Sequence, residues 1–197
     1  MRPPAHTENH SSSMPTILTH AAVPLALGLG LGSSRVPRRL LGAGVLAAIA
    51  PDFDGLAFKL GIAYADAFGH RGATHSLVFA LLLGLVAAAG AQHLQTSRRV
   101  AFLFVAACCL SHPLLDMFTN GGLGVAFWWP FSEARYFSPW QVIEVSPIAL
   151  RRVFSERGLA VLASELRWVW LPALLLGLTL RLGLRATRLW PDVQDRP

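Results

Sequence analysis

Long apolar stretches separated by short polar turns dominate this chain. Two windows, residues 9–34 and 72–97, contain no Asp, Glu, Lys or Arg, and each is 26 residues long. A helix needs roughly 20 apolar residues to cross the hydrocarbon core of a bilayer. Apolar runs and helix breakers predict five helices, over residues 15–32, 38–51, 73–91, 99–118 and 159–182. The expected fold class is therefore all-α, a polytopic membrane helix bundle of about five transmembrane helices.

Two connections in this pattern are unusual. From Arg39 to Asp52 there are 13 steps, or roughly 20 Å of helix, so Pro51 is expected to end the second helix short of a full crossing. Between the fourth and fifth helices lies a 40-residue connection, residues 119–158, which contains the motifs WWPF and SPW. Its aromatic content predicts a long interfacial loop that covers the bundle as a lid.

Composition supports the membrane interpretation and excludes other classes. Only 14% of residues are charged, against about 25% in soluble domains. The net charge of +6 does not indicate nucleic-acid binding, because most of the arginines lie at the ends of apolar runs. Cys108 and Cys109 are adjacent in an apolar run and are expected to be small core residues rather than a disulfide.

Arginines in the short connections predict the orientation. The clusters at residues 35–39, 98–99 and 181–188 fall on one face, which the excess of positive charge marks as cytoplasmic. We expect residues 1–13 to form a polar, disordered tail that is not a signal peptide. Residues 14–183 would then form the membrane-embedded domain, and residues 184–197 a short cytoplasmic tail.

Seven His and Asp side chains fall at the ends of the predicted helices opposite these arginines. His20 is 15 residues from Arg35, and His112 is 13 residues from Arg99, so both lie roughly 20–22 Å from the basic face, as Asp52 does. The full set is His20, Asp52, Asp54, His70, His75, His112 and Asp116. Ionisable groups at such depth are costly unless they are paired or bind a metal ion.

This set predicts a metal site. His112 and Asp116 are four residues apart and so share one helix face. Imidazole together with carboxylate suits a divalent transition metal, first zinc and alternatively manganese or iron, rather than calcium. The seven residues are enough for one closed site or a two-metal site. Taken singly, each residue has an alternative, such as a hydrogen-bonded core histidine or a His112–Asp116 pair.

Five ordered motifs carry a resemblance to a known family. They are MPTILTHAAV, PDFDGLAF, HRGATHSL, SHPLLDMFTNGG and VAFWWPFSEARYFSPW. Together they resemble the YdjM family, described as LexA-regulated, inner-membrane-associated, metal-dependent hydrolases, from about Met14 to the end of the fifth predicted helix. The resemblance implies a hydrolase in the bacterial inner membrane whose metal ligands fall on the seven residues above. The HxxxD spacing is also similar to that of zinc-dependent phospholipase C and P1-type nucleases, which cleave phosphoesters.

Hydrolysis by a metal-activated water molecule is accordingly the leading hypothesis. Asp54 would act as a general base and Arg71 would hold a phosphate group. A site below an aromatic loop favours an amphipathic substrate, such as a lipid or a lipid-linked phosphoester, with membrane lipids as partners. Ion or proton transport is an alternative, although the apolar inner halves of the first four helices oppose it. A metal-binding membrane protein without turnover is the other alternative.

Overall fold

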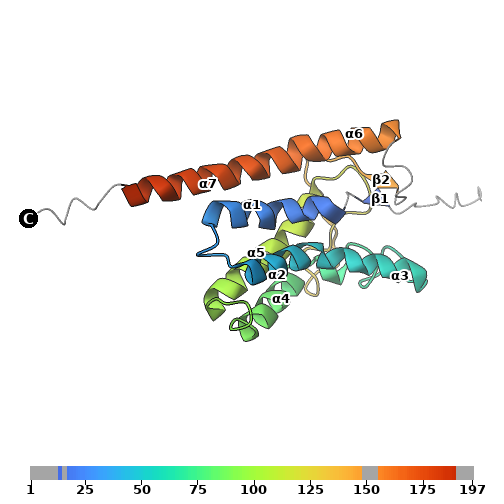
Figure 1. The fold of residues 1–197 in the computed structure, drawn as a ribbon. Helices are drawn as coiled ribbons and strands as arrows, with labels where there is room; N and C mark the ends of the chain where they lie inside the picture. Colours follow the sequence, from blue (N-terminus) through green and yellow to red (C-terminus); the bar gives the residue numbers. More distant parts are fainter. Residues whose placement is uncertain (1–12, 15–16, 148–154, 190–197) are drawn as a thin grey trace, which may run out of the picture.

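The computed structural model describes residues 13–14, 17–147 and 155–189, which form a bundle of helices (Figure 1). The α-helices are α1 (Ala22–Leu31), α2 (Arg38–Ile49), α3 (Leu56–Lys59), α4 (Leu77–Ala89), α5 (Arg98–Met117), α6 (Glu156–Glu165) and α7 (Leu171–Leu189). Three 3-10 helices, η1 (Ile17–Ala21), η2 (Ala50–Gly55) and η3 (Ala73–His75), and the π-helix η5 (Leu166–Trp170) connect them. The two-residue strands β1 (Ser13–Met14) and β2 (Ser146–Pro147) pair antiparallel.

Helix α5 lies at the centre of the bundle. Helices α2 and α4 pack against it, and α1 packs against α7, which runs along one side of the bundle (Figure 1). Glycines permit these close approaches: a Cβ atom at Gly44 would lie 2.5 Å from the Phe104 ring, and one at Gly177 would lie 2.7 Å from the Ala26 carbonyl oxygen. Small residues at helix contacts are typical of membrane bundles, since close backbone packing drives their association.

The all-helical prediction is confirmed, and the boundaries differ in two places. Helical structure continues past Pro51 through η2 and α3 to Lys59, so the expected stop at Pro51 is wrong. Pro51 lies at the start of η2, where its missing N–H costs nothing. Helix α4 begins only at Leu77, because the Ser76 hydroxyl caps it by accepting a hydrogen bond from the Phe79 amide at 3.1 Å.

The last predicted helix is longer than expected and contains a π turn. Helices α6, η5 and α7 follow one another without a break from Glu156 to Leu189. Pro172 lacks the N–H that a regular helix needs and crowds the preceding turn, and the wider turn of η5 directly before it accommodates this defect. Of the two predicted tails, residues 1–12 and 190–197 lie outside the described residues.

Three helical segments are long and apolar enough to cross a membrane. By length and composition they are Arg38–Lys59, Arg98–Met117 and Glu156–Ala186. Two shorter apolar helices, Thr19–Leu31 and Leu77–Ala89, have 13 residues each and are therefore about 20 Å long. Five crossings therefore stay a prediction, because these two helices are shorter than a bilayer core of about 30 Å.

The close α1–α7 contact generates a stability prediction. Gly177→Ala places a methyl group against the Ala26 backbone, which cannot rotate away, so we expect it to cost about 1–3 kcal/mol of unfolding free energy. Gly183→Ala is the matched control, since a Cβ atom there meets no atom within 4 Å. Thermal unfolding in detergent measures both variants, and a Gly177→Ala variant as stable as Gly183→Ala would contradict the packing.

Candidate metal centre

The ends of four helical elements bring a cluster of ionisable side chains together. Its members are His20 on η1, Asp52 and Asp54 on η2, His75 on η3, and His112 and Asp116 on α5. The three histidines are fully buried, and no carboxylate in the cluster is more than 8% exposed. Residues from sequence positions almost 100 apart thus meet at one depth, as the helix-rise argument predicts.

Nitrogen and oxygen atoms in this cluster have the mutual spacing of ligands around one ion. The Nε2 atoms of His75 and His112 are 3.1 Å apart, and Asp116 Oδ2 lies 3.3 Å from the former and 3.7 Å from the latter. Asp52 Oδ1 is 3.4 Å from His112 Nε2. Tetrahedral zinc with bonds of about 2.0–2.2 Å separates neighbouring ligand atoms by about 3.3–3.6 Å.

Two of the histidines are oriented by contacts at Nδ1, the ring nitrogen that does not face the other histidine. His112 Nδ1 donates to the carbonyl of Ala48, 2.6 Å away in the last turn of α2. His75 Nδ1 lies 3.0 Å from Asp54 Oδ2, the partner that metal-binding histidines commonly have. With both Nδ1 atoms protonated, the Nε2 lone pairs of the two rings face each other, an arrangement that a cation between them stabilises.

Several buried polar atoms in the cluster have no hydrogen-bond partner. They are both ring nitrogens of His20, Oδ2 of Asp52 and Oδ1 of Asp116. Such atoms cost roughly 1–3 kcal/mol each, so they are rare without a ligand. His20 and Asp116 form one triad with His112, and Asp52 and His75 form a second with the same His112, each with ligand atoms within 4.8 Å.

The charge of the buried cluster also fits a divalent cation. Asp52, Asp54 and Asp116 contribute three negative charges, and the fully buried Arg71 contributes one positive charge. With the histidines neutral, as metal ligation requires, the cluster has a net charge of about −2 in a region of low dielectric, where unbalanced charge is costly. The donor set of imidazole and carboxylate is that of zinc, manganese or iron sites.

Asp54 and His70 lie outside the two triads. The Asp54 carboxylate faces four donors: His70 Nδ1 at 2.6 Å, the Arg71 amide at 3.0 Å, the Thr74 hydroxyl at 2.7 Å and His75 Nδ1 at 3.0 Å. Its oxygens are therefore used for holding residues 70–75 in place. Asp54 contacts Nδ1 of His75, the ring nitrogen that faces away from His112, and His70 contacts Asp54. Neither Asp54 nor His70 belongs to the two triads.

Arg71 lies beside the cluster in a left-handed backbone conformation, with φ of 59°. Its Nε is 3.1 Å from Asp116 Oδ2, and its Nη1 donates to the Gly121 carbonyl at 2.8 Å. The guanidinium thus offsets the negative charge of Asp116 and ties the 119–145 segment to the site. Its Nη2 is buried without a hydrogen-bond partner.

Sequence reasoning missed Arg135 and Tyr64, through which the α5–α6 connection contacts the segment beside the site. Arg135 donates to the carbonyls of His70 and Tyr64, each at 3.0 Å, and so fastens the α5–α6 connection over residues 64–71. Burial raises the pKa of the Tyr64 phenol, which stays protonated. No spacing signal could reveal these contacts, because the acceptors are backbone carbonyls 65 or more residues away in the chain.

Comparison with known proteins identifies the family. Residues 14–189 match the sequence profile of the YdjM inner membrane protein family. The inner membrane protein YbcI of Escherichia coli (strain K12) is 52% identical over 164 residues, which are 83% of this chain and 95% of the relative. No solved structure matches the chain. The resemblance seen in the five sequence motifs is confirmed: the chain is an inner membrane protein and belongs to the YdjM family.

Proposed function

We propose that this protein is a membrane-embedded, metal-dependent hydrolase of phosphoesters carried by lipids. The observation that carries the proposal is the convergence of buried, partly unpartnered His and Asp atoms at ligand spacing. A divalent metal ion at this position, most simply zinc, would polarise an ester oxygen and lower the pKa of a water molecule to about 7. The name of the relative states only its location, so the activity rests on the site.

Each residue of the site has a distinct role in this proposal. His75, His112 and Asp116, whose ligand atoms lie 3.1–3.7 Å apart, hold the ion, and Asp52 and His20 complete its surroundings. Asp54 positions His75 rather than acting as the base. Asp52 is the better candidate for a general base, since its Oδ2 has no hydrogen-bond partner, whereas both oxygens of Asp54 are engaged.

Apolar surfaces around the site favour an amphipathic substrate. Asp52 and Asp54 are the least buried carboxylates of the cluster, and the side chains of Phe53, Leu56 and Leu60, which are more than half exposed, lie close to them in the chain. A separate groove of about 470 Å³ is lined by apolar side chains that include Leu115, next to Asp116 in the chain. A lipid chain could occupy such surfaces while its ester meets the cluster.

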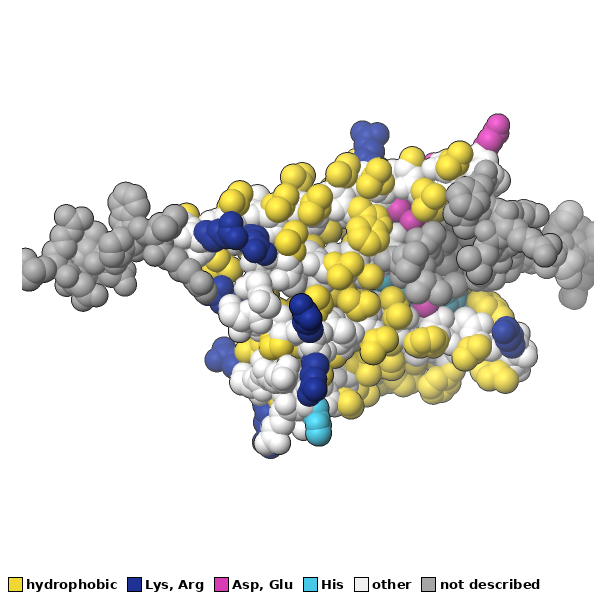
Figure 2. Space-filling view, viewed as in Figure 1, with side chains coloured by type: hydrophobic (Ala, Val, Ile, Leu, Met, Phe, Trp, Pro, Cys, Tyr) yellow, Lys and Arg dark blue, Asp and Glu magenta, His cyan; other side chains and the backbone are white. Residues whose placement is uncertain are grey.

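The distribution of polar residues opposes transport. Below the cluster, α2, α4 and α5 enclose an apolar core that includes Leu40, Ala80, Phe104 and Val105. Most Lys and Arg side chains gather at the opposite end of the bundle, around the α1–α2 connection (Figure 2). A transporter would need polar groups through that core. With the basic end cytoplasmic, the site faces the periplasmic side, and all five apolar helices enter the membrane.

Metal content provides the first prediction of this proposed function. Protein purified in detergent should contain at least one zinc, manganese or iron ion per chain, and His112→Ala should lose it because His112 belongs to both triads. His93→Ala is the control, since His93 is exposed and distant in sequence from the ligands. Elemental mass spectrometry with far-UV circular dichroism measures both properties. A folded His112→Ala protein with unchanged metal content would refute the site.

The hydrogen bonds of Asp54 provide the second prediction. Asp54→Asn keeps the shape of the side chain but weakens the orientation of His75, so metal affinity should fall by about 10–100-fold. Asp66→Asn removes an exposed carboxylate from the connection between α3 and η3 and should leave the affinity unchanged. Competition with a chelator of known affinity measures both variants. Equal affinities would mean that Asp54 does not position a ligand.

Turnover provides the third prediction. The metal-loaded protein should hydrolyse a lipid phosphoester in mixed micelles faster than the water-soluble bis-p-nitrophenyl phosphate. Chelation should abolish the reaction without loss of helical signal, and zinc should restore it. His112→Ala should be inactive and His93→Ala active. Metal-bound protein that cleaves none of these esters above the His112→Ala background would instead favour a metal-binding membrane protein without hydrolase activity.

A further inference from the structure

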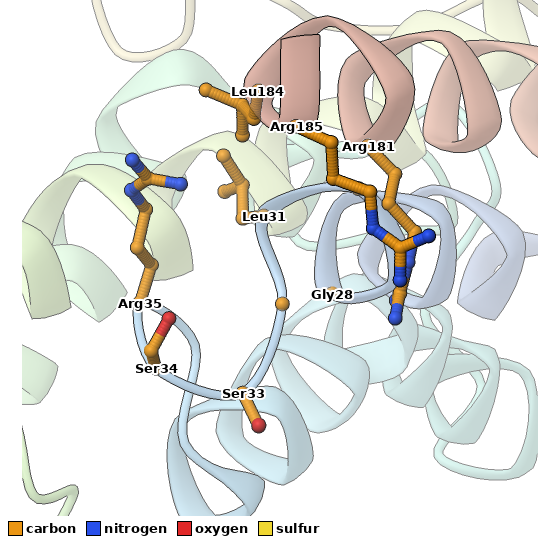
Figure 3. Close-up of a pocket in the computed structure, with 10 residues that line it drawn as sticks. Gly28, Leu31, Ser33, Ser34, Arg35, Arg181, Leu184 and Arg185 are labelled. Atoms are coloured by element: carbon orange, nitrogen blue, oxygen red, sulfur yellow. The ribbon is translucent and has the colours of Figure 1, made fainter. Parts of the chain in front are cut away.

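A second cavity lies at the basic end of the bundle, away from the His/Asp cluster. It encloses about 400 Å³ between the end of α1, the α1–α2 connection and the last turns of α7. Arg181 and Arg185 enter from α7 on one side, Arg35 stands on the opposite side, and Ser33 and Ser34 lie along the connecting loop (Figure 3). Its volume is within the range of small-molecule sites.

The packing of α1 against α7 creates this cavity. Gly177 touches the α1 backbone at Ala26, and Arg181 and Arg185 follow it by four and eight residues, on the same face of α7. Helix α1 ends at Leu31, whereas α7 continues to Leu189, so the last turns of α7 extend past the end of α1 and line the cavity together with the α1–α2 connection. Arg181 Nη1 is anchored there, because it donates to the carbonyl of Leu29 at 3.1 Å.

The cavity carries positive charge without a balancing carboxylate in its walls. Residues 17–51 and 166–189, which contain all of the lining side chains, include no Asp or Glu. Within the described part of the chain, Arg35, Arg181 and Arg185 form no ion pair. Arginine forks and serine hydroxyls are the donors that bind phosphate oxygens.

We propose that this cavity binds the phosphate group of an anionic phospholipid. The arginines and Ser34 surround the phosphate, and Leu31 and Leu184 on the upper wall contact the apolar part of the lipid (Figure 3). Basic pockets between helices at the cytoplasmic membrane surface are suited to such head groups. The site does not depend on the proposed hydrolase activity, since different residues and a different end of the bundle form it.

Native mass spectrometry of the full chain in detergent tests this proposal. We expect phosphatidylglycerol to bind, phosphatidylcholine to bind far less, and Arg181→Gln/Arg185→Gln to weaken the former on the order of tenfold or more. Arg98→Gln/Arg99→Gln removes the same charge from exposed positions at the start of α5 and should bind like the unaltered protein. Within the described residues, the side chain of Arg35, unlike that of Arg181, donates no hydrogen bond to the backbone of α1. Arg35→Gln should therefore weaken binding without affecting folding.

Two results would overturn the proposal. If Arg181→Gln/Arg185→Gln and Arg98→Gln/Arg99→Gln weaken phosphatidylglycerol binding equally, the net charge of the protein, and not this cavity, retains the lipid. Binding of sn-glycerol 1-phosphate as tight as that of phosphatidylglycerol, measured by the same method, would assign the cavity to a soluble phosphoester. Metal content measured in parallel should be unchanged in all these variants, which separates this test from that of the metal centre.

Discussion

The site depends on the hydrogen bonds that the Asp54 carboxylate accepts. This carboxylate gathers His70, the Arg71 amide, Thr74 and His75 around η2, and so holds an irregular segment against the helical core. Irregular backbone at membrane depth is tolerated only where protein satisfies its polar groups. The same contacts leave His75 Nε2 3.1 Å from His112 Nε2, so the packing of this segment also sets the geometry of the His/Asp cluster.

Helix α5 supplies the complementary half of the site. His112 and Asp116 are one turn apart, and α5 packs between α2 and α4 through small or apolar residues such as Cys108. Because this packing fixes the helix, the Ala48 carbonyl at the end of α2 can orient His112. A packed helix thus positions His112 and Asp116, and hydrogen-bonded turns position the other members of the cluster.

Much of this arrangement follows from the sequence, because hydropathy and helix rise are local properties. They predict the five helical stretches and the common depth of His20, Asp52 and His112. They do not predict that the Asp54 carboxylate is occupied by donors from residues 70–75, since that depends on which donors this segment presents to it. The continuation of helix past Pro51 was missed for a similar reason: a proline can equally end one helix or begin the next.

The two ends of the bundle have opposite electrostatic requirements, and the apolar core keeps them apart. At one end, three carboxylates outnumber one buried arginine, and a divalent cation would neutralise the difference. At the other, arginines without carboxylate partners favour a phosphate. The α1–α7 contact at Gly177 shapes the cationic end, whereas η2 and α5 shape the anionic end. Different side chains form the two ends, so a substitution at one end leaves the residues of the other unchanged and the two proposals can be tested separately.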